Sequence, residues 1–205
     1  MSKANEVYLY VSRKLKYLQS EANTGTGRAM LANIRRGIGK QPGELPELWG
    51  LIFNNLPEEL LGKGAASYSE WAIYTALTLY ALHQQGYDPD KENMHKENIS
   101  LGEAAANLVK KECEGNKERI ESSREHIEKR LNLIVTATSQ KDLAYYLRSV
   151  IQLLSANSIP LDYALLAKQL YEMNFEESSQ RVKINWGRKF YSVLNYKEEE
   201  NKNEQ

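Results

Sequence analysis

Cysteine is almost missing from this chain of 205 residues, because Cys113 is the only one. A single thiol excludes a disulfide framework and a thiolate metal site within one chain, and it suits a reducing compartment. No stretch reaches the roughly 18 apolar residues of a membrane span, and residues 1–10 have no apolar core of a secretory signal. We therefore expect a cytoplasmic protein.

Motifs for nucleotide hydrolysis, metal binding and nucleophilic catalysis are also missing. Residues 62–64 read Gly-Lys-Gly, which lacks the hydroxyl residue that follows the lysine of a phosphate-binding loop. The histidines, His83, His95 and His126, do not have the spacing of metal ligands on one helix, and no Gly-x-Ser-x-Gly turn occurs. We expect no enzyme, no cofactor and no metal. A hydrolase would need side chains that converge only in the folded chain.

Net charge is zero overall, with 27 basic and 27 acidic residues, but the charge is unevenly distributed. Residues 1–40 hold eight Lys and Arg against two acidic residues, whereas residues 41–121 hold seven against fourteen. Near-neutrality argues against a protein that coats nucleic acid indiscriminately. The basic beginning of the chain predicts local binding of an anionic partner.

Two runs without acidic residues carry the candidate binding residues. The first contains Arg28, Arg35, Arg36 and Lys40, and the second surrounds Trp186 and contains Arg181, Lys183, Arg188 and Lys189. In each run two arginines are seven residues apart, or two helical turns, so both point away from the apolar stripe. A basic helix face is usually only soluble exterior, but its recurrence favours contact with phosphate.

Apolar residues recur at helical spacing along almost the whole chain, most clearly in residues 143–154, and no strand pattern occurs. Ser69 is predicted to cap a helix that is apolar nearly all round, with Trp71 in the core. Ser179 is predicted to open the last helix, with an inward stripe of Val182, Trp186, Phe190 and Val193. We predict an all-α protein with no sheet. Its expected parts are an N-terminal helical bundle with a basic face (1–98), a C-terminal helical bundle packed against it (99–195) and a disordered acidic tail (196–205).

Six blocks of sequence then suggest a family. They read G-R-A-x-L-A-x-I-R-R-G-x-G with P-G-x-x-P-E-L-W (Gly27 to Trp49), L-Y-A-L-H-Q-Q-G (Leu79 to Gly86), I-S-L-G-x-A (Ile99 to Ala104), L-R-x-V-I-x-L-L (Leu147 to Leu154), P-L-D-Y-x-x-L-A-x-x-L (Pro160 to Leu170) and W-G-R-x-F-Y (Trp186 to Tyr191). Taken in order, they resemble the CasB family, the small subunit of the type I-E CRISPR surveillance complex, Cascade.

The resemblance implies a two-part helical protein without catalytic activity, which acts in antiviral defence beside a second copy of itself. It implies assembly with the large subunit CasA, the backbone subunit CasC, CasD and CasE. It also implies contacts with the CRISPR RNA (crRNA) and with the target and non-target DNA strands of the R-loop. The alternative is a helical scaffold whose basic faces bind acidic proteins.

The candidate nucleic-acid-binding residues have two origins. The matching blocks imply Arg28, Arg35, Arg36, Arg148, Lys168 and Arg188. Charge and position alone add Lys40, Arg119, Lys141, Arg181, Lys183 and Lys189.

Overall fold

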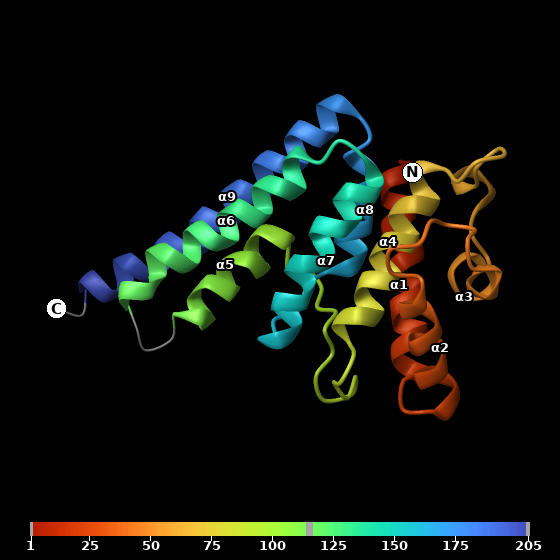
Figure 1. The fold of residues 1–205 in the computed structure, drawn as a ribbon, viewed down its shortest axis with the longest axis horizontal. Helices are drawn as coiled ribbons and strands as arrows, with labels where there is room; N and C mark the ends of the chain where they lie inside the picture. The colour runs from red at the N-terminus through yellow and green to blue at the C-terminus, as the bar shows by residue number, and fades with distance from the viewer. Residues whose placement is uncertain (1, 114–116, 204–205) are drawn as a thin grey trace.

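The computed structural model describes residues 2–113 and 117–203. Over these residues the only pairing of extended backbone is an isolated parallel bridge between His95 and Leu161, so the predicted all-α class is confirmed (Figure 1). The α-helices are α1 (Lys3–Glu21), α2 (Gly25–Arg36), α3 (Trp49–Phe53), α4 (Tyr68–His83), α5 (Leu101–Glu112), α6 (Ile120–Thr136), α7 (Gln140–Ala156), α8 (Tyr163–Glu172) and α9 (Glu176–Asn203). Short 3₁₀ turns lie at η1 (Pro46–Leu48), η2 (Glu58–Leu60) and η3 (Lys117–Arg119).

Helix α4 lies at the centre of the fold. Its residues 72–81 are all buried, because α1, α2, α7 and α8 pack around it. An apolar surface on every side is typical of a helix enclosed by other helices, which explains why this segment has no polar face.

The N-cap of α4 is Ser67, and the prediction of Ser69 is wrong. The Ser67 hydroxyl accepts a hydrogen bond from the Glu70 amide at 3.0 Å, and the Glu70 carboxylate accepts one from the Ser67 amide at 2.7 Å. Three residues after Ser69 stands Ala72, which cannot return such a bond. The reciprocal pair therefore selects the earlier serine.

Helices from both halves of the sequence share one core. Helix α8 packs extensively against α1 and also against α4, and the buried apolar residues form one continuous cluster. Figure 1 shows α7 and α8 between the N-terminal helices and a second group made of α5, α6 and α9. The division at residue 98 into two bundles therefore stays an expectation.

Helix α9 packs along α5 and buries Val182, Trp186 and Phe190 of the predicted stripe, while Val193 is partly buried. The helix begins at Glu176 and not at Ser179, because the Ser179 amide already donates to the Phe175 carbonyl at 2.8 Å and so lies within the first turn.

The C-terminal end of α9 differs from the expected disordered tail. The helix continues to Asn203, whereas disorder is expected over 196–205, and residues 204–205 lie outside the described residues. Extending an existing helix needs no new nucleation, and Lys and Glu are good helix formers. A charged segment can therefore continue α9 without an apolar anchor.

Candidate nucleic-acid interface

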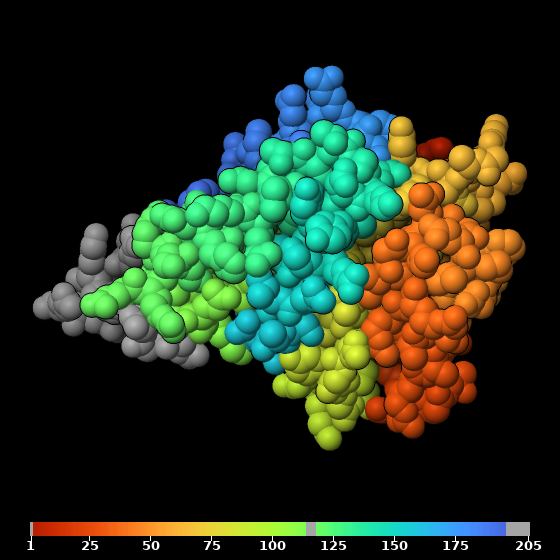
Figure 2. Space-filling model, viewed as in Figure 1, coloured from red at the N-terminus to blue at the C-terminus, as the bar shows by residue number. Residues whose placement is uncertain are grey.

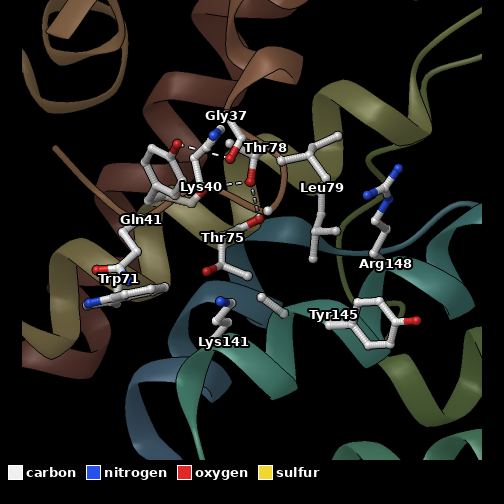
Figure 3. A pocket seen from close by; sticks show the side chains of 14 residues that line it. Gly37, Lys40, Gln41, Trp71, Thr75, Thr78, Leu79, Lys141, Tyr145 and Arg148 are labelled. Atoms are coloured by element: carbon white, nitrogen blue, oxygen red, sulfur yellow. Dashed lines mark hydrogen bonds between the residues drawn. The ribbon is translucent and has the colours of Figure 1, made fainter. Parts of the chain in front are cut away.

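A cavity of about 130 Å³ opens between the loop that follows α2, the middle of α4 and the first half of α7. In the space-filling view, the cyan surface of α7 borders the orange surface of the residues after α2 (Figure 2). The side chains that line it include Lys40, Gln41, Trp71, Thr75, Lys141, Tyr145 and Arg148 (Figure 3). Among the described residues, no Asp or Glu lines this cavity, so three cations face one opening without an acid between them.

Helix α7 presents Lys141, Tyr145 and Arg148 on one face, because their spacing of four and three residues follows the helical repeat. Leu147 and Ile151 of the apolar stripe are fully buried and fix the rotation of the helix. Both cations are exposed, and neither forms an ion pair with another described residue. Tyr145 is 69% exposed, so an aromatic face stands in solvent between two free positive charges.

The loop after α2 brings Lys40 to the same opening. Gly37 lies against α4, where the Tyr74 hydroxyl donates to its carbonyl at 3.0 Å, and a Cβ at position 37 would lie 2.6 Å from that hydroxyl. Burial, with smaller effects from nearby carboxylates, raises the pKa of Tyr74 to about 12, so the hydroxyl stays a donor. Gly39 has a φ of 77°, which turns the chain and leaves Lys40 exposed.

Lys40 has an exposed partner on its own loop. Its ammonium lies 3.7 Å from a carboxylate oxygen of Glu44, and both side chains are about half exposed. Exposed ion pairs of this kind contribute about 0–1 kcal/mol, so a phosphate group can displace the carboxylate at little cost.

The arginines of α2 do not join the cavity. Arg35 is half-buried and donates to the Ala81 carbonyl at 3.2 Å, whereas Arg36 lies 3.3 Å from a carboxylate oxygen of Glu47. Arg28 is exposed at the other end of the helix and donates to the Asn23 carbonyl at 3.3 Å. These three predicted residues are therefore spread along α2 and are partly engaged within the protein.

The remaining predicted residues also lie away from the cavity. Lys168 donates to the Asn5 side chain at 2.7 Å and so joins α8 to α1, and Arg119 is exposed at the end of η3. On α9, Arg181 lies 4.0 Å from a Glu172 carboxylate oxygen, while Lys183 lines a separate groove between α6 and α9. The other two α9 cations, Arg188 and Lys189, are exposed. The structure thus brings together three of the twelve predicted residues.

Two aromatic residues of the cavity were not among the predicted binding residues. Trp71 was assigned to the core, yet it is only partly buried and lines the opening. Tyr145 lies off the apolar stripe, four residues after Lys141 and three before Arg148. This helical spacing in the sequence places it on the same face as the two cations.

A second cavity was not predicted. It has a volume of about 490 Å³ and is lined by residues of α1, α2 and the α3 region, including Arg13, Lys14 and Tyr17. The Lys14 ammonium stands 5.5 Å from the centre of the Tyr10 ring. Burial lowers the pKa of Lys14. The signal in the sequence is the absence of acidic residues from 7 to 20.

Two of the histidines, His83 and His95, form hydrogen-bonding contacts with Tyr163 inside the protein, and the third lies on its surface. His83 Nδ1 lies 2.7 Å from the Tyr163 hydroxyl, and His95 Nδ1 accepts from the Tyr163 amide at 3.2 Å. His126 Nε2 lies 3.1 Å from a guanidinium nitrogen of Arg130 on the surface of α6. Across residues 2–113 and 117–203, no three His, Cys, Asp or Glu side chains are grouped to hold a metal ion. Over the same residues no helix combines the length and apolarity that crossing a bilayer requires.

Comparison with known proteins agrees with this fold. Residues 30–191 match the sequence profile of CRISPR-associated protein Cse2. No curated protein matches the sequence significantly.

Three solved structures are similar over most of the chain. CasB from Thermobifida fusca is 33% identical with a TM-score of 0.73, and the match covers 90% of this chain and 97% of that one. CasB from M. ruber (22% identity, TM-score 0.65, 92% and 96% covered) and CasB from Thermus thermophilus (22% identity, TM-score 0.61, 94% and 99% covered) share the fold.

Proposed function

The chain belongs to the Cse2 family of CRISPR-associated proteins, and on this premise we propose that it is the non-catalytic small subunit of a type I-E Cascade complex. In that role it binds the nucleic-acid backbone and thereby stabilises crRNA/target pairing and the displaced non-target strand of the R-loop. Its proposed partners are CasA, CasC, CasD, CasE and a second copy of the chain.

One observation carries this proposal: Lys40, Lys141 and Arg148 surround a single opening that no carboxylate lines among the described residues. Lys and Arg bind phosphates without reading sequence, because their contacts are with the backbone. A guide-RNA complex leaves sequence reading to base pairing, and opening the DNA duplex is nearly balanced in free energy. A few phosphate contacts are then enough to favour the open state.

The experiment that tests the proposal measures the affinity of the full chain for single-stranded DNA as a function of salt. The logarithm of affinity falls against the logarithm of salt with a slope of about 0.7 for each neutralised phosphate on a single strand. The triple variant Lys40→Gln/Lys141→Gln/Arg148→Gln is expected to lower that slope by about 2.

A matched control makes the same change of charge elsewhere. Lys63, Lys91 and Lys129 are exposed lysines that do not line the cavity, so replacing them with glutamine is expected to leave the slope almost unchanged. A wild-type affinity that does not depend on salt, or equal slopes for the two triple variants, would contradict the proposal.

A second candidate function, binding of acidic partner proteins, rests on α9. Arg181, Ile184, Arg188 and Tyr191 follow one another at spacings of three, four and three residues and are all exposed, with Ile184 at 52% and Tyr191 at 47%. Aromatic residues and arginine are enriched at protein interfaces. Under this function, Arg188→Glu/Lys189→Glu prevents assembly with the other Cascade subunits. Under nucleic-acid binding, assembly is retained and R-loop lifetime falls.

A further inference from the structure

We propose that the cavity between α4, α7 and the loop after α2 takes one unstacked nucleobase of a single strand, while Lys40, Lys141 and Arg148 hold the phosphates on either side. This inference rests on the proposed function and makes it more specific, because it names the part of the ligand that enters the protein.

The size of the cavity fits part of a ligand and not a whole one. Its volume of about 130 Å³ is well below the roughly 300–1,000 Å³ of pockets that enclose a complete drug-sized molecule. The three cations line the cavity and are exposed, so a strand that contacts all three would pass over the opening. A planar base turned out of that strand is the group that can enter.

Aromatic side chains stand on two sides of the cavity. Figure 3 shows Trp71, from α4, and Tyr145, from α7, at opposite ends of the lining, with Thr75 and Lys141 between them. Stacking on aromatic rings is how proteins hold bases of single strands without sequence preference, because every base has a flat π-face. Tyr145 is 69% exposed, so its ring is accessible for stacking on a base.

Polar groups of the lining have unused hydrogen-bonding capacity. The Thr78 hydroxyl already donates to the carbonyls of Tyr74 and Thr75, at 2.8 and 3.1 Å. Neither the Thr75 hydroxyl nor the Gln41 side-chain amide forms a hydrogen bond with another described residue. A hydroxyl and an amide each donate and accept, so together they can bond the edge of any base.

Charge distinguishes this occupant from a side chain of a partner protein. The opening has three cations and, among the described residues, no lining carboxylate, which suits an anionic chain that continues on both sides of the inserted group. A protruding aromatic residue of a protein would contact the walls of the cavity but would leave Lys141 and Arg148 without an anionic partner. The distribution of charge therefore favours a nucleotide.

The test compares two labelled oligomers of equal length and charge, oligothymidylate and an oligomer built only of abasic sites. Anisotropy titrations of the full chain give the ratio of the two affinities. One stacked base predicts a ratio of about ten in favour of thymidylate. Ala144→Leu fills the cavity from α7 without changing charge, because Ala144 lines it, and lowers the ratio to about one.

The matched control is Ala156→Leu, an exposed position at the end of the same helix, which keeps the wild-type ratio. Because the readout is a ratio, it does not depend on the fraction of each variant that is folded. If the wild type binds both oligomers equally and with salt dependence, the nucleobase inference is wrong and the proposed function stands.

Three other outcomes also decide. If Ala144→Leu does not lower the ratio of the affinities for thymidylate and the abasic oligomer, the base contacts lie elsewhere and the inference is wrong. A wild-type ratio of one together with loss of Cascade assembly in Ala144→Leu would show that a partner protein fills the cavity. No binding of either oligomer would overturn the proposed function as well.

Discussion

Gly102 of α5 lies so close to Trp186 of α9 that a Cβ atom at position 102 would stand 2.0 Å from the Trp186 carbonyl oxygen. The Trp186 ring is buried, and its indole nitrogen donates to the Gln169 side chain at 2.8 Å, so α9 cannot shift without breaking this bond. The two residues belong to two of the sequence blocks on which the family resemblance rests. Their contact explains why α5 and α9 pack so extensively.

We expect Gly102→Ala to lower the free energy of unfolding by about 2 kcal/mol, because the added methyl group forces two helices apart. Gly187→Ala is the matched control on α9, where an added Cβ meets no atom within 4 Å. Since alanine is the better helix former, the control is expected to be more stable by up to about 1 kcal/mol. Urea unfolding followed by circular dichroism measures both changes, and a similar effect of both variants would disprove the close contact.

The cap of α4 gives a second prediction. Ser67→Ala removes the acceptor of the Glu70 amide and the donor to the Leu60 carbonyl, the latter at 2.6 Å, and should cost about 1–2 kcal/mol of unfolding free energy. The Ser69 hydroxyl forms no hydrogen bond with another described residue, so Ser69→Ala is expected to change stability by less than about 0.5 kcal/mol. Thermal melts give the melting temperatures of the two variants. A lower melting temperature for Ser69→Ala than for Ser67→Ala would refute the assignment of the cap.

Stability should fall in mild acid because of His83. Burial lowers the pKa of this imidazole from 6.5 to about 4, whereas the unfolded chain takes up the proton near 6.5. Between these values the unfolded state binds more protons, so the free energy of unfolding decreases by about 3 kcal/mol as pH falls from 6.5 to 4.

The variant His83→Gln removes that titration. His95, whose pKa burial also lowers, acts in the same direction and stays in both proteins, so the difference between their pH profiles isolates His83. We expect the wild type to lose more stability than the variant on acidification from pH 7 to pH 4, measured by urea unfolding. Parallel profiles would show that His83 does not titrate in this way.

The weak ion pair of Lys40 predicts a gain of affinity. Glu44→Gln frees Lys40 for phosphate and keeps an oxygen that can accept from the Gln41 amide, so binding of single-stranded DNA should tighten by about two- to fivefold at low salt. Glu47→Gln frees Arg36, which lies outside the cavity, and is the control with little expected change. Equal gains in both variants would mean that net charge matters and position does not.

Much of the helical architecture could be predicted because its signals are local. Leu147, Val150, Ile151 and Leu154 recur at the helical repeat and are all fully buried on α7. Trp186 and Phe190 were likewise expected in the core and are found there. A periodic stripe selects the helix and the face that packs, whatever its partner is.

The position of the α4 cap was predicted less well for a physical reason. Two serines stand two residues apart, and both have the intrinsic preference for an N-cap. The choice depends on which of them Glu70 can bond in return, and this carboxylate is further fixed by the Gly62 amide at 3.0 Å. Propensity alone does not include that second bond.

The helical class, the buried stripes and the family can be inferred from the order of residues alone, because all three follow from residues that are near one another in the chain or stand in collinear blocks. Which cations lie together depends on how the helices pack. Lys40 meets Lys141 and Arg148 because α2 and α7 both pack against α4 and carry residues a hundred positions apart to one opening. The α2 arginines share a sequence run with Lys40 but lie elsewhere, since a side chain's neighbours in space depend on helix packing and not on distance along the chain.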